Sequence, residues 1–242
     1  MKIKYFTLPN ILTLSNLLCG VVATLLAISH IWSPAEAPLT LPILFTLASA
    51  IFDFLDGFAA RLTGQYSPLG VQLDSLADMV SFGVTPSVVL VAMFNDAQGE
   101  GWWWLICLGV ALCSALRLAR FNIDEEQKES FIGLPTPALA IAIGSLAWAM
   151  QTGSIVLSPS HILAISVVGA WLLISPIRMF SFKFKTFALK ENAVRLGFAT
   201  LALTCFIVGG VGTLWVVILL YILTSLIIQL TSTIKTNRER RA

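Results

Sequence analysis

Charged side chains are scarce in this chain, and their scarcity excludes a soluble protein. Of its 242 residues only 12% are Asp, Glu, Lys or Arg, whereas 57% are hydrophobic, and the mean hydropathy is +0.87. Soluble domains carry about 25% charged residues. The composition therefore predicts an integral membrane protein. The net charge of +2 does not indicate a nucleic-acid partner, and we expect none.

Cysteine and histidine are also few, which limits the nucleophiles and metal ligands that the chain can offer. The four cysteines lie inside apolar stretches without the spacing of a metal site, so we expect small core residues: Cys19, Cys107, Cys113 and Cys205. The two histidines, His30 and His161, fall at the ends of apolar stretches that we assign to the external side of the membrane.

Runs of about 20 apolar residues predict eight membrane spans. They lie near 11–30, 40–61, 71–94, 102–120, 134–152, 161–177, 194–209 and 212–231. Only the glycine-rich turn 209–212 separates the last two, which predicts a tight hairpin. We expect an all-α fold in which six core helices over residues 1–190 are followed by this hairpin and a basic tail over 191–242.

Basic residues are absent from every second predicted loop. With the N-terminus in the cytoplasm, all 15 Lys and Arg residues fall in cytoplasmic segments, while the opposite loops hold only Glu36, Asp96 and Glu100. This separation predicts a cytoplasmic-membrane protein, surrounded by lipid, with both termini in the cytoplasm. A signal peptide cleaved near Ala37 would break the pattern, and its apolar run is too long.

Four aspartates lie within two of these apolar stretches. Asp53 and Asp56 are three residues apart in the second span, and Asp74 and Asp78 are four apart in the third, so each pair shares a helix face. The turn 62–69 brings the two faces together below the cytoplasmic surface. A lone carboxylate at mid-bilayer costs from ~2.5 to well over 10 kcal/mol. A cation is therefore required, and Mg²⁺, Mn²⁺ or Ca²⁺ suits these ligands.

Small residues and an arginine accompany the aspartates. Gly57 lies one turn from Asp53 and from Arg61, and Ala60 lies one turn from Asp56. Small residues allow a flat group to lie against a helix, and an arginine at the mouth can bind a phosphate in a forked geometry. The combination indicates a site for a nucleotide diphosphate joined to a lipid, with two divalent ions that polarise a phosphoryl group.

The full pattern, D-x2-D-G-x2-A-R-x8-G-x3-D-x3-D from Asp53 to Asp78, resembles the signature of the CDP-alcohol phosphotransferases, with every specified position matched. The resemblance implies an intramembrane enzyme, commonly a homodimer, that transfers a phosphatidyl or similar group from a CDP-linked lipid to an alcohol and releases CMP. It also implies two divalent cations, Mg²⁺ or Mn²⁺.

The resemblance also implies roles for individual residues. Asp53 and Asp74 would bridge both metals, Asp56 would complete the first site and Asp78 the second, and Asp78 would be the general base. The residues that would bind the CDP-lipid are Asn10, Thr13, Gly57, Ala60, Arg61, Ser67 and Gly70. Asn10 and Thr13 belong to a polar series with Asn16 along one face of the first span.

Four further segments resemble the phosphatidylserine synthase branch of that family: 8–20, 117–122, 131–137 and 175–183. This likeness implies CDP-diacylglycerol as donor, L-serine as acceptor and phosphatidylserine as product. The carboxylate of serine needs cationic partners, and the candidates for the acceptor site are Arg117, Arg120, Asn122, Arg178 and Lys183. The alternative is that these cations only anchor the cytoplasmic ends of helices.

Other functions stay open at this point. The same chemistry with glycerol 3-phosphate or an inositol phosphate would need a denser basic pocket, and choline would need an aromatic cage. A cation or proton transporter would also place carboxylates in the membrane. However, transporters spread their ion ligands over paired repeats, whereas here all four aspartates lie on one predicted hairpin. A structural membrane protein whose metal only holds helices together would not explain Gly57, Ala60 and Arg61.

Overall fold

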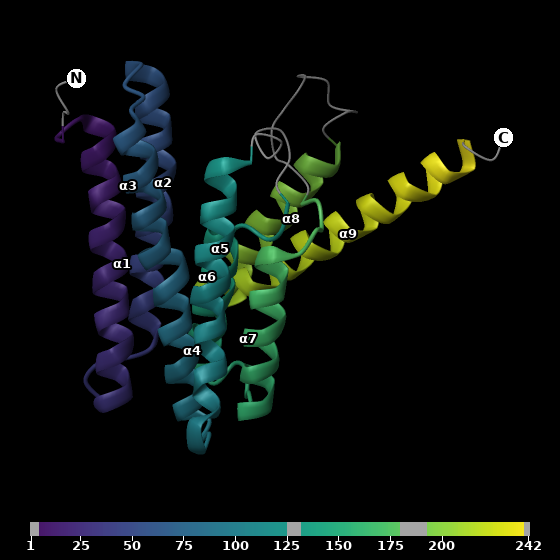
Figure 1. The fold of residues 1–242 in the computed structure, drawn as a ribbon. Helices are drawn as coiled ribbons and strands as arrows, with labels where there is room; N and C mark the ends of the chain where they lie inside the picture. The colour runs from purple at the N-terminus through teal and green to yellow at the C-terminus, as the bar shows by residue number, and fades with distance from the viewer. Residues whose placement is uncertain (1–4, 125–131, 180–192, 240–242) are drawn as a thin grey trace.

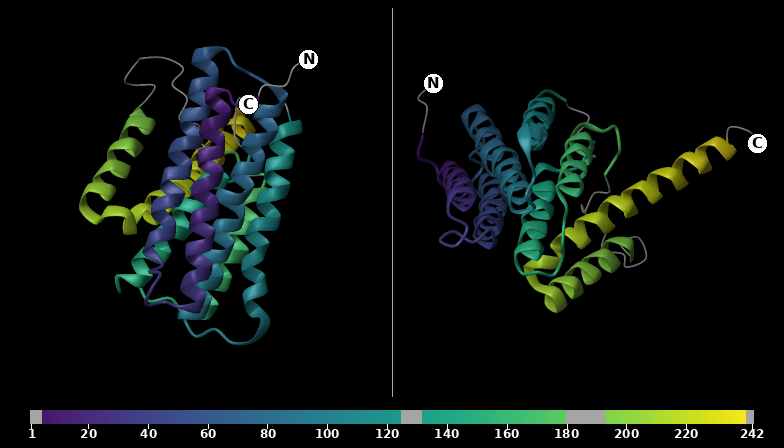
Figure 2. Two further views of the ribbon diagram at one scale, coloured as in Figure 1. Left: turned by 90° about the vertical axis from the view of Figure 1, so that its left-hand side faces the viewer. Right: turned by 90° about the horizontal axis from the view of Figure 1, so that it is seen from below.

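The computed structural model describes residues 5–124, 132–179 and 193–239 as a bundle of helices (Figures 1 and 2). The helices are α1 (Leu8–Trp32), α2 (Thr40–Thr63), α3 (Pro68–Asp78), π-helical η1 (Met79–Val84), α4 (Thr85–Asp96), 3₁₀-helical η2 (Gly101–Leu108), α5 (Gly109–Ile123), α6 (Thr136–Gln151), α7 (Pro159–Ile174), α8 (Ala193–Gly209), 3₁₀-helical η4 (Gly210–Thr213) and α9 (Leu214–Glu239). In these three ranges the β interaction is a single bridge, Ile132 with Arg178. The all-α prediction is confirmed.

The helices are apolar enough for a multi-pass membrane protein, but their lengths differ from the predicted ones. Stretches long enough to cross a membrane are Leu8–Trp32, Thr40–Thr63, Pro68–Asp96, Gly101–Ile123 and Leu203–Gln229. The last runs through the end of α8, η4 and the start of α9. Helices α6 and α7 have 16 residues each, which gives about 24 Å at 1.5 Å per residue, less than the ~30 Å hydrocarbon core.

Prolines explain where α6 and α7 begin and where α7 ends relative to their predicted spans, 134–152 and 161–177. Pro135 is the N-cap residue of α6, and Pro159 occupies the first turn of α7. Helix α7 ends at Ile174, with Ser175 as its C-cap and Pro176 next. A proline cannot donate the backbone hydrogen bond that a helix interior needs. Hydropathy alone therefore overestimates both helices.

Helices α1 and α3 begin in the same way, with a hydroxyl cap followed by proline. Thr7 Oγ1 accepts a hydrogen bond from Asn10 N (3.4 Å), and Ser67 Oγ accepts one from Gly70 N (3.0 Å). Helix α2 ends at Thr63, and its C-cap residue Gly64 has a left-handed φ of 63°, which suits glycine. The N-terminus and this α2–α3 turn lie at the same end of the bundle (Figure 1).

The opposite end of the bundle is closed by a buried histidine. His30 lies in the last turn of α1, where its Nδ1 is 2.7 Å from the Ala37 carbonyl and its Nε2 is 2.9 Å from Asp96 Oδ2. Leu39 N also donates to Gln151 Oε1 there. The His30–Asp96 contact joins α1 to α4, and the Leu39–Gln151 contact joins the start of α2 to α6. Both lie at the end of the bundle away from the α2–α3 turn.

Helix α1 approaches η1 so closely that glycine is required at the contact. A Cβ at Gly20 would overlap the side chain and backbone of Ser81. Hydroxyls of η1 and α4 donate hydrogen bonds to carbonyls of α1. Ser81 Oγ donates to Asn16 O (3.1 Å), and Thr85 Oγ1 donates to Gly20 O (3.0 Å). The contact holds η1, and with it the end of α3, against α1.

Helices α8 and α9 lie beside this bundle, with α9 running obliquely past α6 and away from the upright helices (Figures 1 and 2). Ser145 of α6 links the two parts, because its hydroxyl donates to Val211 O (2.8 Å) and accepts from Trp215 N (3.0 Å). Tyr221 of α9 is buried in the same apolar core as Leu139 and Leu173. The start of α9 is therefore part of the core.

We expect Gly20→Ala to lower the thermal unfolding midpoint of the protein in detergent. Forcing a methyl group into a packed contact costs about 1–3 kcal/mol. The control is Gly109→Ala, where the new Cβ would lie 4.0 Å from Ala170 Cβ and meet nothing closer. Both changes favour helix formation by similar amounts. Equal midpoints for the two variants would contradict the close packing of α1 on η1.

Candidate active site

Three aspartates from two helices converge in the interior. Asp53 and Asp56 of α2 and Asp74 of α3 each offer a carboxylate oxygen, and these oxygens all lie within 4.8 Å of one another. Asp56 is 6% exposed. The α2–α3 turn reverses the chain, and both helices pack on α1, which brings their carboxylates together.

Asp78, one turn beyond Asp74, lies beside this group. It is the last residue of α3 and is buried where the π-helical turn η1 begins. Its Oδ1 accepts a hydrogen bond from Asn16 Nδ2 of α1 (3.0 Å). Asp78 is also close enough to Asp53 and Asp74 for their charges to repel it.

The chemistry of this donor set fits a divalent metal. Within the part of the chain that the structure describes, the ion pairs join other groups, His30 with Asp96 and Arg120 with Asp124. Asp74 Oδ1 is buried and has no hydrogen-bond partner. Converging carboxylate oxygens without a protein cation are the ligands that Mg²⁺ and Mn²⁺ prefer.

Helix α1 supplies the hydrogen-bond donors to the carboxylates. Thr13 Oγ1 donates to Asp56 Oδ2 at 2.6 Å, while Asn16 serves Asp78. Asn16 is fully buried, and its own Oδ1 has no partner. The sequence prediction assigned Asn10 and Thr13 to the site but not Asn16. The signal was present in the three-residue spacing of this polar face, which places all three side chains toward α2 and α3.

A cavity of about 200 Å³ opens beside the carboxylates. Its lining is Pro9, Asn10, Thr13, Asp56, Gly57, Ala60, Gln65, Tyr66, Ser67, Gly70, Val71 and Asp74. We call it the carboxylate pocket. Six of the seven residues predicted to bind the CDP-lipid line it. The seventh, Arg61, is exposed near the end of α2 and is not among the lining residues.

Two glycines of this pocket, Gly57 and Gly70, leave space that a larger side chain would fill. A Cβ at Gly57 would meet nothing within 4 Å, so the α2 backbone is bare toward the cavity. A Cβ at Gly70 would lie 3.2 Å from Ser67 Oγ and 3.3 Å from Asn10 Oδ1. Glycine therefore keeps the backbone of α2 accessible and leaves room around the α3 cap.

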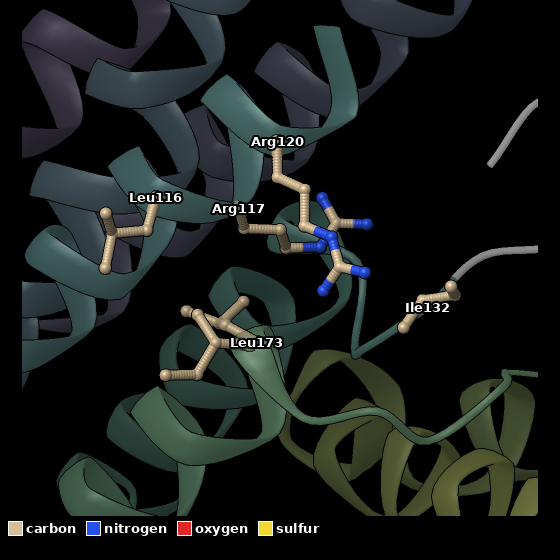
Figure 3. Close-up of a pocket in the computed structure, with 6 residues that line it drawn as sticks. Leu116, Arg117, Arg120, Ile132 and Leu173 are labelled. Atoms are coloured by element: carbon tan, nitrogen blue, oxygen red, sulfur yellow. The ribbon is translucent and has the colours of Figure 1, made fainter. Parts of the chain in front are cut away.

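A second cavity, of about 210 Å³, is lined by Leu116, Arg117, Arg120, Ile132, Leu173 and Ile174. We call it the arginine pocket; Figure 3 shows Arg117 and Arg120 reaching from α5 toward Ile132. Arg117 is only 8% exposed, and its Nε is buried without a hydrogen-bond partner. Arg120 is exposed and pairs with Asp124 (3.4 Å). A buried, unpaired guanidinium nitrogen beside a cavity is suited to an anion.

The other predicted acceptor residues lie differently. Asn122 faces α3, where its Nδ2 donates to Ser75 Oγ at 2.9 Å. Arg178 is exposed, and its backbone pairs with Ile132 at the wall of the arginine pocket. Lys183 lies outside the described residues. The structure thus brings Arg117 and Arg120 to one pocket and Arg178 to its wall, but not Asn122.

Arg117 also connects the two pockets electrostatically. Its guanidinium is close enough to the Asp78 carboxylate for attraction between the two charges. Asp78 therefore responds both to the aspartates of the carboxylate pocket and to the cation of the arginine pocket. A group bound near Asp78 would lie between an anion-binding side and a cation-binding side.

Comparisons with known proteins agree with the motif. A family model described as CDP-alcohol phosphatidyltransferase matches residues 6–175. The chain is 36% identical over 226 residues to the CDP-diacylglycerol–serine O-phosphatidyltransferase of Mycobacterium leprae, covering 89% of this chain and 72% of that protein. The Bacillus subtilis protein of the same name is 32% identical over 180 residues (73% and 91% covered). The archaetidylserine synthase of Methanothermobacter thermautotrophicus is 33% identical over 146 residues (59% and 58%).

We expect Mn²⁺ or Mg²⁺ to raise the unfolding midpoint of the purified protein in detergent, because a ligand that binds only the folded state stabilises it. The gain is about 2.7 kcal/mol at a concentration one hundred times Kd. Asp74→Asn should abolish the metal-dependent rise, since it removes a charge from the centre of the cluster. Glu100→Gln, exposed at the far end of the bundle, is the control and should keep it. A full rise in Asp74→Asn would contradict metal binding by these aspartates.

Proposed function

The chain belongs to the CDP-alcohol phosphatidyltransferase family, and from this premise we propose that it transfers the phosphatidyl group of CDP-diacylglycerol to L-serine, giving phosphatidylserine and CMP. The observation that carries the proposal is the pair of pockets. One is lined by Asp56, Asp74 and bare backbone, and the other by Arg117, whose buried Nε has no hydrogen-bond partner. Asp78 interacts electrostatically with Asp74 of the first and Arg117 of the second. The names of the relatives in Mycobacterium leprae and Bacillus subtilis support serine as the acceptor.

In this proposal the carboxylate pocket binds the CDP end of the donor lipid. The bare backbone at Gly57 and the small side chain of Ala60 leave space for the flat nucleotide against α2. Asn10 and the Ser67–Gly70 cap border the same cavity. Arg61 lies outside the lining, at the exposed end of α2, where it can reach a phosphate that projects from the pocket.

Two divalent cations, Mg²⁺ or Mn²⁺, would be held by Asp53, Asp56, Asp74 and Asp78. When bound, they would polarise the phosphoryl group and stabilise the leaving phosphate. Thr13 and Asn16 hold the carboxylates of Asp56 and Asp78 in place through the hydrogen bonds already described. The aspartates therefore present their remaining oxygens to one region.

Asp78 is the proposed general base. It would take the proton of the serine hydroxyl while serine Oγ forms a bond to the β-phosphorus, the one next to the lipid. The bond from that phosphorus to the CMP oxygen breaks, and CMP leaves with the electron pair. Direct displacement is supported by the position of His30, which is tied to Asp96 at the other end of the bundle and cannot act as a nucleophile.

The arginine pocket is the proposed site of the serine carboxylate. Arg117 offers a buried nitrogen that has no protein partner, and a carboxylate accepts charge-assisted hydrogen bonds from a guanidinium. Arg120 lies at the same cavity. Since Arg117 also attracts Asp78, a serine held there by its carboxylate would have its hydroxyl on the side of the base.

The membrane orientation is part of the proposal. Two basic residues that the structure describes, Arg61 and Arg120, lie in the last turns of α2 and α5, and both helices end on the side of the bundle that holds the N-terminus (Figure 1). This supports a cytoplasmic-membrane location with that end in the cytoplasm. The active site then faces the cytoplasm, where serine is available. The division at residues 190 and 191 and the homodimer stay predictions, and cross-linking in native membranes would measure the second.

The decisive experiment is CMP release by the purified protein in detergent, with CDP-diacylglycerol and Mn²⁺ or Mg²⁺. Serine, glycerol 3-phosphate, inositol phosphate and choline are tested in parallel. We expect release that depends on serine and falls by at least about a hundredfold in Asp78→Asn, since general bases contribute roughly 10²–10⁴-fold. Release with another acceptor would reject serine but keep the donor site. No release with any acceptor would favour the transporter alternative.

We expect Asn16→Ala to lower kcat about tenfold or more, because the buried Asp78 carboxylate loses its donor, and an unsatisfied buried partner costs ~1–3 kcal/mol. The measurement is the initial rate of CMP release at saturating serine and donor. Ser15→Ala, one residue away on a more exposed side of α1, loses a hydroxyl that bonds the Ile11 carbonyl of its own helix and is the control. Wild-type kcat in Asn16→Ala would exclude a role for this amide.

A further inference from the structure

The C-terminal helix α9 lies beyond residues 6–175, which the family model matches, yet it contacts segments that border the arginine pocket. Its first half packs on α6, fixed by the two hydrogen bonds of Ser145. Its later turns pass the loop that follows α7. The helix therefore has contacts with the described bundle that a helix serving only as a membrane anchor does not need.

Tyr221 is the α9 residue that packs in the apolar core next to the arginine pocket. It is 6% exposed and belongs to the same buried cluster as Leu134, Leu173 and Met179. Leu173 is itself part of the pocket lining. Tyr221 is also close enough to Arg117 for their polar groups to interact electrostatically.

Two turns further along α9, Gln229 contacts the chain segment that forms the Ile132 wall of the arginine pocket. Its Oε1 accepts a hydrogen bond from Arg178 N (3.3 Å), and Arg178 pairs through its backbone with Ile132, a lining residue of the pocket. Nearby, Gly133 N donates to Ile177 O (2.8 Å) and Leu134 N donates to Leu172 O (2.9 Å), which fixes the two chain segments to each other. One helix thus contacts the segment that forms one wall of the cavity and carries a tyrosine that interacts electrostatically with its cation.

Arg117 needs such a support. A long, flexible side chain that is buried with an unpaired nitrogen does not hold one rotamer through its own contacts, and ordering it costs up to about 2 kcal/mol of conformational entropy. In the described structure, its neighbours at the cavity are mostly apolar: Leu116, Ile132, Leu173 and Ile174. Besides Asp78, the phenol of Tyr221 is the group that interacts electrostatically with the guanidinium, which these aliphatic side chains cannot do.

We propose that α9 completes the acceptor site, with Tyr221 as a positioning residue that holds the Arg117 guanidinium toward the arginine pocket. The inference rests on the proposed function, since it takes the serine carboxylate as the anion that Arg117 binds. It gives the C-terminal hairpin a part in acceptor recognition. Tyr221 acts through Arg117 and takes no part in proton transfer or displacement.

The test is the kinetics of Tyr221→Phe, which keeps the ring in the core and removes only the hydroxyl. We expect KM for serine to rise roughly tenfold, the effect of losing one interaction with a charged group. By contrast, kcat and KM for CDP-diacylglycerol should stay within about twofold, because uniform acceptor binding is what is lost. Raising the serine concentration should restore the wild-type rate.

Two further variants separate positioning from packing. Val217→Ala removes buried volume from the same helix one turn earlier and should leave KM for serine unchanged. In the Arg117→Lys background, Tyr221→Phe should add little to KM, since residues that act through one another are not additive. Equal serine KM values in Tyr221→Phe and wild type, or an equal rise in Val217→Ala, would overturn the inference.

The wild-type protein distinguishes this inference from the proposed function. If wild type releases CMP with serine and Tyr221→Phe keeps its KM, only the role of Tyr221 fails. If wild type shows no serine-dependent release, the proposed function fails and the inference fails with it. Serine-dependent release with a selective rise in serine KM supports both.

Discussion

The repulsion among buried carboxylates is the constraint on which the rest of this structure depends. Asp53, Asp56 and Asp74 bring oxygens within 4.8 Å of one another, in helices long and apolar enough to cross a membrane. Apolar packing does not offset that repulsion, whereas hydrogen-bond donors do, as would the divalent cations that we propose. Thr13 and Asn16 supply the donors from α1, and helix α1 is therefore as much a part of the site as the helices that carry the aspartates.

The close approach of α1 explains the glycine and the π-helical turn. Gly20 lets the backbone of α1 lie against Ser81, and the hydroxyls of Ser81 and Thr85 bond α1 carbonyls. The π-helical turn η1 begins directly after Asp78, and such turns interrupt regular helices mostly at functional sites. Asp78, the proposed base, therefore lies at the junction of α3 and η1, where α1 holds its carboxylate through Asn16.

Local geometry made most of the carboxylate pocket predictable from the sequence. Spacings of three and four residues place aspartates on one face of any α-helix, and Gly64 with Ser67 and Pro68 marks the turn between the helices. Other features depend on contacts between distant segments. The bond from Asn16 to Asp78 needs the packing of α1 on α3, the pairing of Asn122 with Ser75 needs the rotation of α5, and η1 has no local sequence signal. The lengths of α6 and α7 were overestimated because hydropathy does not register proline.

The two pockets differ in how far apart in the sequence their helices lie, and this difference bears on how an acceptor could be selected. The carboxylate pocket is formed by α1, α2 and α3, which are close in sequence. The arginine pocket combines α5, α7 and the segment around Ile132, so its shape depends on how distant helices pack. In the proposed function, the donor site can therefore stay constant while the acceptor site varies. Because Asp78 interacts electrostatically with Arg117, an acceptor whose anion neutralised the guanidinium would also change the field at the proposed base. Acceptor binding and deprotonation would then be linked through one pair of residues.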